Sequence, residues 1–376
     1  MKYTKEITVM SSFKSTKTPK YPSDLSKNKY ESRYDRLMNI LFYAKELPSD
    51  LHTQMNMSYD NFRKTISILR QRGWISKINK DGFFGYQLTL SGKKMPYEDP
   101  RYEKYRDCVE EEIDRHHSAK RRGRKRQFAY LYALFDRAGI IYETFLKPSI
   151  KDVKFHDHQV YFYTALDFKR MLGIESTTFI GSRLLGFLVG KGRIITVYRT
   201  NYELKTFGRQ EALVPELLKR YFSVAVNTAI LICEDDGAAM MITHQIIESN
   251  HKDAKGGVNT ARYRYFYVLP STDKFLSCYQ DLFADHTEKQ QRIIDRYHID
   301  TSERDSRGGY RYITGTGYIG RNPVWVCAGV VNVVTLRAFL YNAEMKNIES
   351  YIFCNRRDVD YVEEFTQDTL IDVIAI

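Results

Sequence analysis

Glu203 and Lys205 have the (D/E)xK spacing of residues that cleave phosphodiester bonds with the help of a metal ion. In that chemistry a second carboxylate joins the glutamate to hold Mg²⁺, and the lysine assists the attacking water. The second acid would come from upstream, from Asp167 or Glu175. Because so short a pattern arises easily by chance, we keep a metal-dependent nuclease or nickase as an alternative. We expect Mg²⁺ only under that alternative, and otherwise no cofactor.

His156 and His158 form a second candidate for metal chemistry. Side chains two positions apart on a strand point to the same face, so both imidazoles could bind one metal ion. Asp157 between them would then point into the core, and the neighbouring residues are polar. We therefore expect a polar turn and treat the two histidines as weak metal candidates.

Two further motifs match functional patterns only in part. Glu234-Asp235-Asp236 follows the apolar segment Thr228–Cys233, at the end of a strand where α/β domains place ligands. We expect a strand-to-helix turn capped by an aspartate rather than a metal site. Residues 315–320 match the letters of GxGxxG, but that motif must open a helix. A strand-like segment with Pro323 follows instead, so we expect no dinucleotide.

The segment 58–73 indicates a different chemistry, the recognition of phosphates and bases. Phe62, Ile66 and Leu69 recur at i, i+4 and i+7, which predicts a helix with one apolar stripe. Ser58 is expected to cap its start, and the glycine at the end of the segment is expected to stop it. The residues off the stripe are long hydrogen-bond donors that reach into a major groove.

A β-hairpin is expected directly after this helix. Trp74–Asn79 alternates, Lys80-Asp-Gly82 forms a turn, and Tyr86–Leu90 alternates back. Helix, helix, hairpin is the order of a winged helix, and we expect a short second helix over 51–57. The expected DNA-contacting residues of this unit are Tyr59, Arg63, Lys64, Ser67, Arg70, Lys77, Lys80 and Phe83.

A basic run over 120–126 follows an acidic block over 107–116. One interpretation is a solvated boundary between domains. The other is a basic arm that follows phosphates and adds sequence-independent affinity; its Arg-Gly-Arg core is similar to an AT-hook but lacks the proline. The residues concerned are Arg121, Arg122, Arg124, Lys125 and Arg126.

Composition limits the class of protein. A chain of 376 residues is long enough for two or three domains, and a net charge of +12 favours polyanions as partners. No apolar run reaches the ~18 residues of a membrane span, and no signal-peptide core is present at the start. We expect a cytoplasmic protein without a membrane partner. The five scattered cysteines contain no CxxC pair and are expected to be reduced core thiols.

The expected fold combines α+β winged-helix-like N-terminal and middle domains with a C-terminal α/β domain whose sheet is mainly parallel. The middle domain depends on helices over 128–138, 165–172 and 177–188 and on strands over 160–163 and 193–198. From residue 225 on, short apolar strands alternate with helices, which is typical of a covered parallel sheet. The expected divisions are 1–28 flexible basic arm, 29–95 winged helix, 96–126 charged linker, 127–224 second winged-helix-like domain, and 225–376 α/β domain with an irregular insertion at 284–322.

Three places carry a family resemblance. They are residues 73–75 and 86–92 around the hairpin, the middle segments 163–169, 182–186 and 197–200, and the ending at Phe353-Cys and Tyr361-Val. The chain resembles winged-helix proteins of Firmicutes-type mobile genetic elements, the replication-relaxation-like mobilisation group. The resemblance implies DNA binding near an origin or transfer locus and a C-terminal domain of nuclease-like fold. No catalytic residue carries over, because none matches.

We therefore expect a double-stranded DNA-binding protein that acts in replication, transfer or regulation of a mobile genetic element. Expected partners are double-stranded DNA, a second copy of the chain through the C-terminal domain, and replication or transfer proteins. The alternatives are the nuclease and a self-assembling structural or adaptor protein. Metal-dependent strand cleavage would distinguish the first alternative, and a concentration-dependent mass without DNA would support the second.

Overall fold

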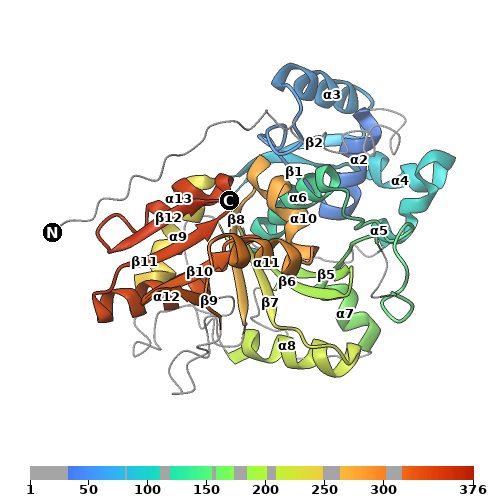
Figure 1. Cartoon of the computed structure of the whole chain (residues 1–376). Helices are drawn as coiled ribbons and strands as arrows, with labels where there is room; N and C mark the ends of the chain where they lie inside the picture. The colour runs from blue at the N-terminus through green and yellow to red at the C-terminus, as the bar shows by residue number, and fades with distance from the viewer. Residues whose placement is uncertain are drawn as a thin grey trace.

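The structure is a computed structural model of mixed α/β architecture (Figure 1). Its strands form three sheets within the described part of the chain. That part comprises residues 33–80, 83–110, 119–154, 158–172, 184–200, 209–248, 263–301 and 316–376.

The first sheet belongs to the N-terminal unit, which lies around α3 at the top of Figure 1. β3 pairs antiparallel with both β1 and β2, which gives the order β1-β3-β2, and Lys80 lies opposite Phe83 at the end of the hairpin. The expected hairpin is therefore confirmed, with residues 81 and 82 outside the described part. The elements are α2 (Arg33–Ala44), β1 (Glu46–Pro48), α3 (Tyr59–Gln71), β2 (Ile75–Lys80) and β3 (Phe83–Leu88).

The local signals placed α3 correctly. The Ser58 hydroxyl accepts a hydrogen bond from the Asn61 backbone N–H at 3.3 Å, as an N-cap does. After the helix, Gly73 adopts a φ of 70°, which a residue without Cβ reaches at little cost. The expected short second helix is wrong, because residues 51–56 form hydrogen-bonded turns. Leu51 and Met55 are buried there as expected, and Asn56 has a φ of 51°, where the turns end.

The next helices are α4 (Leu90–Glu98), η1 (Pro100–Tyr105), α5 (Arg106–Glu110) and α6 (Ala119–Ala138). The basic run over 120–126 is the first part of α6 and not a linker, because the same helix continues into the expected stripe over 128–138. α6 packs against α2, β1 and α10. Its Phe135 contacts Phe162 and Phe275, with ring centroids 4.9 and 6.3 Å apart, so α6 lies in the core between the N-terminal unit and the second sheet.

The second sheet has five strands in the order β4-β5-β6-β7-β8. The pairs β4/β5 and β5/β6 are antiparallel, whereas β6/β7 and β7/β8 are parallel. The expected division at 224/225 therefore crosses a sheet, because the described strands of 127–224, β4 to β6, share it with β7 and β8. The elements are β4 (Tyr161–Thr164), α7 (Ala165–Leu172), β5 (Gly186–Gly190), β6 (Arg193–Arg199), α8 (Arg209–Phe222), β7 (Thr228–Cys233), α9 (Asp236–Glu248), β8 (Tyr265–Pro270) and α10 (Asp273–Phe283).

The helix that was expected over 177–188 is wrong for its described apolar end, residues 186–188. Residues 186–188 of the expected helix 177–188 belong to the strand β5, and 177–183 lie outside the described part. Every residue of β5 is buried, so its apolar run has no alternation. A short continuous apolar run is equally compatible with a buried helix, and only pairing with β4 and β6 decides between the two.

The third sheet has four strands in the order β12-β11-β10-β9. β10/β11 and β11/β12 are parallel, and β9/β10 is antiparallel. The expected parallel pairing from residue 225 on is present, but it is divided between two mixed sheets. The elements are α11 (Thr287–Arg296), β9 (Thr316–Ile319), β10 (Asn322–Cys327), α12 (Val333–Lys346), β11 (Ser350–Cys354), η4 (Arg356–Asp358), α13 (Val359–Glu363) and β12 (Ile371–Ala375).

The expected irregular insertion at 284–322 contains regular structure at both ends, α11 and β9, while 302–315 lies outside the described part. The two later sheets are joined by Asn332, which caps α12. Its Oδ1 accepts from the Phe266 N–H and its Nδ2 donates to the Arg264 carbonyl, both at 3.0 Å.

The five cysteines are buried and form no disulfide, as expected. Among the helices in the described ranges, none has both the length and the apolar character of a membrane span.

Candidate functional site

α3 separates apolar and polar residues onto two faces. Phe62, Ile66 and Leu69 are buried against the N-terminal core. Tyr59 has 58 % of its surface exposed. The other helix residues that the sequence indicated are exposed as well, and positions three and four apart on a helix lie on one face. They are Arg63, Lys64, Ser67 and Arg70.

The exposed face of α3 is positively charged. Asp60 in the first turn is the acidic residue of the helix. Throughout the described ranges, Arg63, Lys64 and Arg70 form no ion pair, so their charges are available to a ligand. Arg72 follows the helix and places its guanidinium 4.8 Å from the centre of the Trp74 ring. An uncompensated cluster of this kind attracts a polyanion.

The hairpin adds further cations and one aromatic ring. Lys77 and Lys80 are exposed on β2, and the Lys77 ammonium lies 6.0 Å from the centre of the Phe84 ring. Phe84 is 50 % exposed on β3, whereas the side chain of Phe83 lies outside the described part. Phe84 is thus a candidate contact that the sequence analysis missed. The strand alternation contained the signal, because neighbouring residues on a strand face opposite sides.

The basic run does not form a free arm. Arg124 donates from Nη2 to the Leu184 carbonyl at 2.8 Å. Arg126 lies 3.8 Å from the Glu46 carboxylate of β1, and both side chains are largely buried. Both arginines therefore have contacts within the fold, and the expectation that they follow phosphates stays a prediction. Lys125 is half-buried, and the side chains of Arg121 and Arg122 lie outside the described part.

Of the candidates for metal chemistry, the described part of the chain contains His158 and Asp167. His156, Glu175, Glu203 and Lys205 lie outside the described part, and His158 is exposed. Asp167 accepts hydrogen bonds from the Lys147 ammonium and from the Thr164 backbone N–H, both at 2.8 Å, at the start of α7. Among the residues that the structure places, no group of three or more His, Cys, Asp or Glu could hold a metal ion.

Two motifs form the structures that were expected of them. The Asp235 carboxylate accepts from the Ala238 backbone N–H at 2.7 Å, so the segment after β7 is a capped turn into α9. Gly317 lies in β9, and the chain turns at Gly320, with a φ of 64°, into the antiparallel β10. The GxGxxG letters therefore end in a hairpin and not in the helix that a dinucleotide requires.

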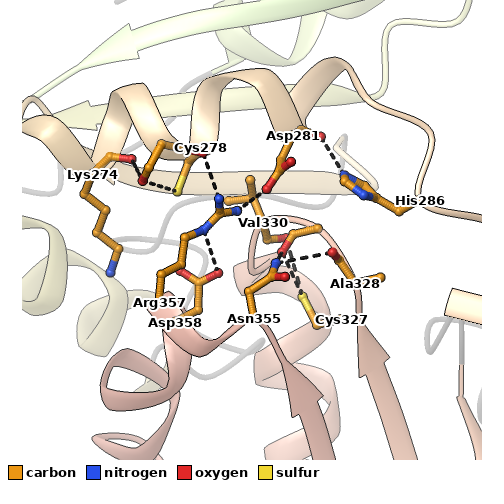
Figure 2. A network of polar contacts seen from close by, with 12 residues as sticks. Lys274, Cys278, Asp281, His286, Cys327, Ala328, Val330, Asn355, Arg357 and Asp358 are labelled. Carbon is orange, nitrogen blue, oxygen red and sulfur yellow. Dashed lines mark hydrogen bonds and ion pairs between the residues drawn. The ribbon is translucent and has the colours of Figure 1, made fainter. Parts of the chain in front are cut away.

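A polar network that the sequence analysis missed joins α10 to the ends of β10 and β11 (Figure 2). Arg357 donates from Nη1 to the Ser277 carbonyl at 2.8 Å and pairs through Nη2 with Asp281. Its Nε lies 3.4 Å from the carboxylate of Asp358, which is 2 % exposed. Burial raises the pKa of Asp358 above its ordinary value. No motif marks these residues, because the network forms only when distant segments meet.

The same network continues at the carboxyl ends of β10 and β11. The Asn355 Nδ2 donates to the Gly329 carbonyl at 2.6 Å and to the Ala328 carbonyl at 3.2 Å. The Asn355 Oδ1 accepts a hydrogen bond from the Lys289 ammonium of α11. Its polar groups are therefore used within the fold.

Comparison with protein-family models, with curated proteins and with solved structures finds no match to the chain.

Proposed function

We propose that the chain binds double-stranded DNA, with α3 in the major groove and the β2–β3 hairpin as the wing of a winged helix. The observation that carries this proposal is the exposed face of α3, where Arg63, Lys64 and Arg70 have no ion-pair partner in the described chain while the opposite face is buried. A major groove admits an α-helix, and arginine and lysine are the side chains that most often contact guanine there.

The dimensions and the sheet support this assignment. A helix of 13 residues is ~20 Å long, enough to cross a groove that is ~12 Å wide. The β2–β3 hairpin follows α3 directly along the chain, and its exposed lysines are suited to contact the phosphate backbone. The net charge of +12 favours the same partner.

α3 is also held firmly, as a recognition element needs to be. Arg36 of α2 donates from Nη1 to the Met55 carbonyl at 3.0 Å, just before α3, and from Nε to Asp136 of α6 at 2.6 Å. The His52 ring packs against Tyr59 and Phe62. The turn before α3 is thus fixed to two helices, so the exposed face is presented in one orientation.

The first test is selection of a bound duplex from random DNA, followed by anisotropy titrations with the selected duplex and a scrambled one. Arg63→Ala is expected to weaken binding to the selected duplex by ~1–3 kcal/mol and to change binding to the scrambled duplex less, because base contacts carry specificity. Lys219→Ala, an exposed lysine of α8, is the control and should bind like the unaltered protein. Equal losses on both duplexes with Arg63→Ala would remove α3 from base recognition.

The biological setting stays a prediction that rests on the family resemblance. We propose that binding serves replication, transfer or regulation of a mobile genetic element, with replication or transfer proteins and a second copy of the chain as further partners. The nuclease alternative depends on Glu203 and Lys205. Incubating supercoiled plasmid with the protein, with and without Mg²⁺, tests it: metal-dependent nicking that Glu203→Ala abolishes would make the protein an enzyme.

A further inference from the structure

A cavity of about 180 Å³ lies where the parallel strands of the second and third sheets end. β8 ends here at Pro270, and the segment after β10 contributes Val330. The first turns of α9, α10 and α13 also line the cavity. Crevices at the carboxyl ends of parallel strands are where α/β proteins bind ligands. This position is separate from α3 and from the hairpin.

The wall of the cavity combines an apolar floor with charged side chains. Met240, Leu269 and Val330 are among its apolar residues. Lys274 of α10 contributes an ammonium group, which lies 4.6 Å from the centre of the Tyr361 ring. Figure 2 shows Lys274 extending from α10 toward the segment that carries Asp358.

Carboxylates of two kinds border the cavity. Asp358 is buried, and Arg357 already engages it. Asp236 and Asp360 are exposed, and among the residues that the structure places neither their side chains nor that of Lys274 forms an ion pair or a hydrogen bond. The cavity is therefore bordered by one ammonium group and three carboxylates. Lys274 is close enough to lower the pKa of Asp358, whereas Asp236 and Asp360 have no ion-pair partner among the described residues.

Helix stabilisation accounts for only part of this arrangement. Asp236 and Asp360 lie in the first turns of α9 and α13, where carboxylates interact favourably with the helix dipole. That role requires neither an apolar floor nor a lysine in the same wall, and Asp358 is a partner for only part of the wall's charge. Both features are explained by a ligand that carries two opposite charges and an apolar body.

The volume limits the size of such a ligand. Pockets for drug-sized molecules and cofactors occupy ~300–1,000 Å³, so a cavity of about 180 Å³ suits a smaller molecule. We propose that this cavity binds a free α-amino acid with an aliphatic side chain. Its carboxylate pairs with Lys274, its ammonium lies between Asp236 and Asp360, and its side chain covers the apolar floor.

Calorimetric titration of the full-length protein with L-leucine tests this proposal. Two analogues serve as matched probes: 4-methylpentanoic acid lacks the ammonium group, and 3-methylbutylamine lacks the carboxylate. Each is expected to bind at least ~10-fold more weakly than leucine, because each leaves one charged partner without its hydrogen bonds. Analogues that bind as tightly as leucine, or leucine that produces no binding heat, would overturn the proposal.

Substitutions assign each charge to its partner. Lys274→Met is expected to weaken leucine binding ~10-fold and to leave the binding of 3-methylbutylamine unchanged. The double variant Asp236→Asn/Asp360→Asn should weaken leucine binding as well and leave 4-methylpentanoic acid unchanged. Lys274→Arg should restore most of the affinity, because it keeps the charge and can keep the contact with Tyr361.

Lys219→Met on α8 is the control for the loss of a lysine and should bind leucine normally. Thermal unfolding of each variant, with and without leucine, shows whether it is folded. Leucine should raise the unfolding temperature of the unaltered protein and of Lys274→Arg more than that of Lys274→Met. Equal stabilisation of all these variants would place the ligand elsewhere and contradict the assignment.

Discussion

The exposed face of α3 and the network around Arg357 both contain cationic side chains, but these side chains have different roles. The cations of α3 come from one helix of 13 residues and have no ion-pair partner in the described chain. Arg357 instead binds residues 80 and 76 positions away, and one of its partners is almost fully buried. An exposed, unpaired cation contributes little to folding and is available to a ligand. A cation bound to several acceptors from distant segments holds the fold together, and its removal leaves the buried Asp358 carboxylate without this partner.

The largest expected effect of a single substitution is therefore on stability and lies in the network. Arg357→Ala should lower the free energy of unfolding by ~3 kcal/mol, because Asp358 would remain buried without its partner. Arg292→Ala, an exposed arginine of α11, should change it by less than ~0.5 kcal/mol. Urea unfolding measures both. DNA affinity per folded molecule should be unchanged, and a loss of affinity with Arg357→Ala would break the comparison.

A substitution of Arg126 in the basic run 120–126 tests whether a paired arginine serves the fold rather than DNA binding. Arg126→Met should lower the free energy of unfolding by ~2 kcal/mol, because it removes the guanidinium that lies 3.8 Å from the largely buried carboxylate of Glu46. DNA affinity in anisotropy titrations should stay within error of the unaltered protein. Arg220→Met, on the exposed surface of α8, is the matched control. A variant of normal stability that binds DNA more weakly would return Arg126 to the phosphate-binding residues.

The hairpin lysines should show the reverse behaviour. The double variant Lys77→Ala/Lys80→Ala is expected to weaken binding to any duplex and to lower the slope of log K against log salt by ~1 for each phosphate that the hairpin no longer neutralises. Its unfolding free energy should stay within ~0.5 kcal/mol of the unaltered value, because both side chains are exposed. An unchanged salt slope would mean that the hairpin does not touch the backbone.

The smallest expected effect is a change of stability with pH. Burial raises the pKa of Asp358 in the folded protein above the ~3.9 of an unfolded chain. Ionisation of this group therefore weakens folding, increasingly as pH rises from ~4 through the folded pKa. The side chain of the Asp358→Asn variant cannot ionise. The unfolding free energy of the variant minus that of the unaltered protein should therefore increase with pH over this window and stay constant above it. A difference that is constant across urea unfolding curves at several pH values would contradict this assignment.

Much of the local structure could be predicted from the sequence. The apolar stripe of Phe62, Ile66 and Leu69 and the cap at Ser58 defined α3, and their period also indicated which side chains face outward. Strand alternation gave the hairpin, and α7 and β7 have the expected bounds. The predictions of secondary structure were wrong where an apolar pattern fitted both a helix and a strand, or where the segment had too few apolar residues. The apolar run of β5 fits a strand or a buried helix, and α11 is so polar that its segment was expected to be irregular.

The sequence by itself determined the local elements and the charged face of α3, because helix and strand periods depend on residues a few positions apart. Only the tertiary structure decided which strands share a sheet, and it joined β6 to β7 across the expected division. It also placed Arg126 3.8 Å from the largely buried carboxylate of Glu46, and it brought Lys274, Asp236 and Asp360 to one cavity. Burial and pairing depend on segments far apart in the chain, and no local pattern records which of them meet.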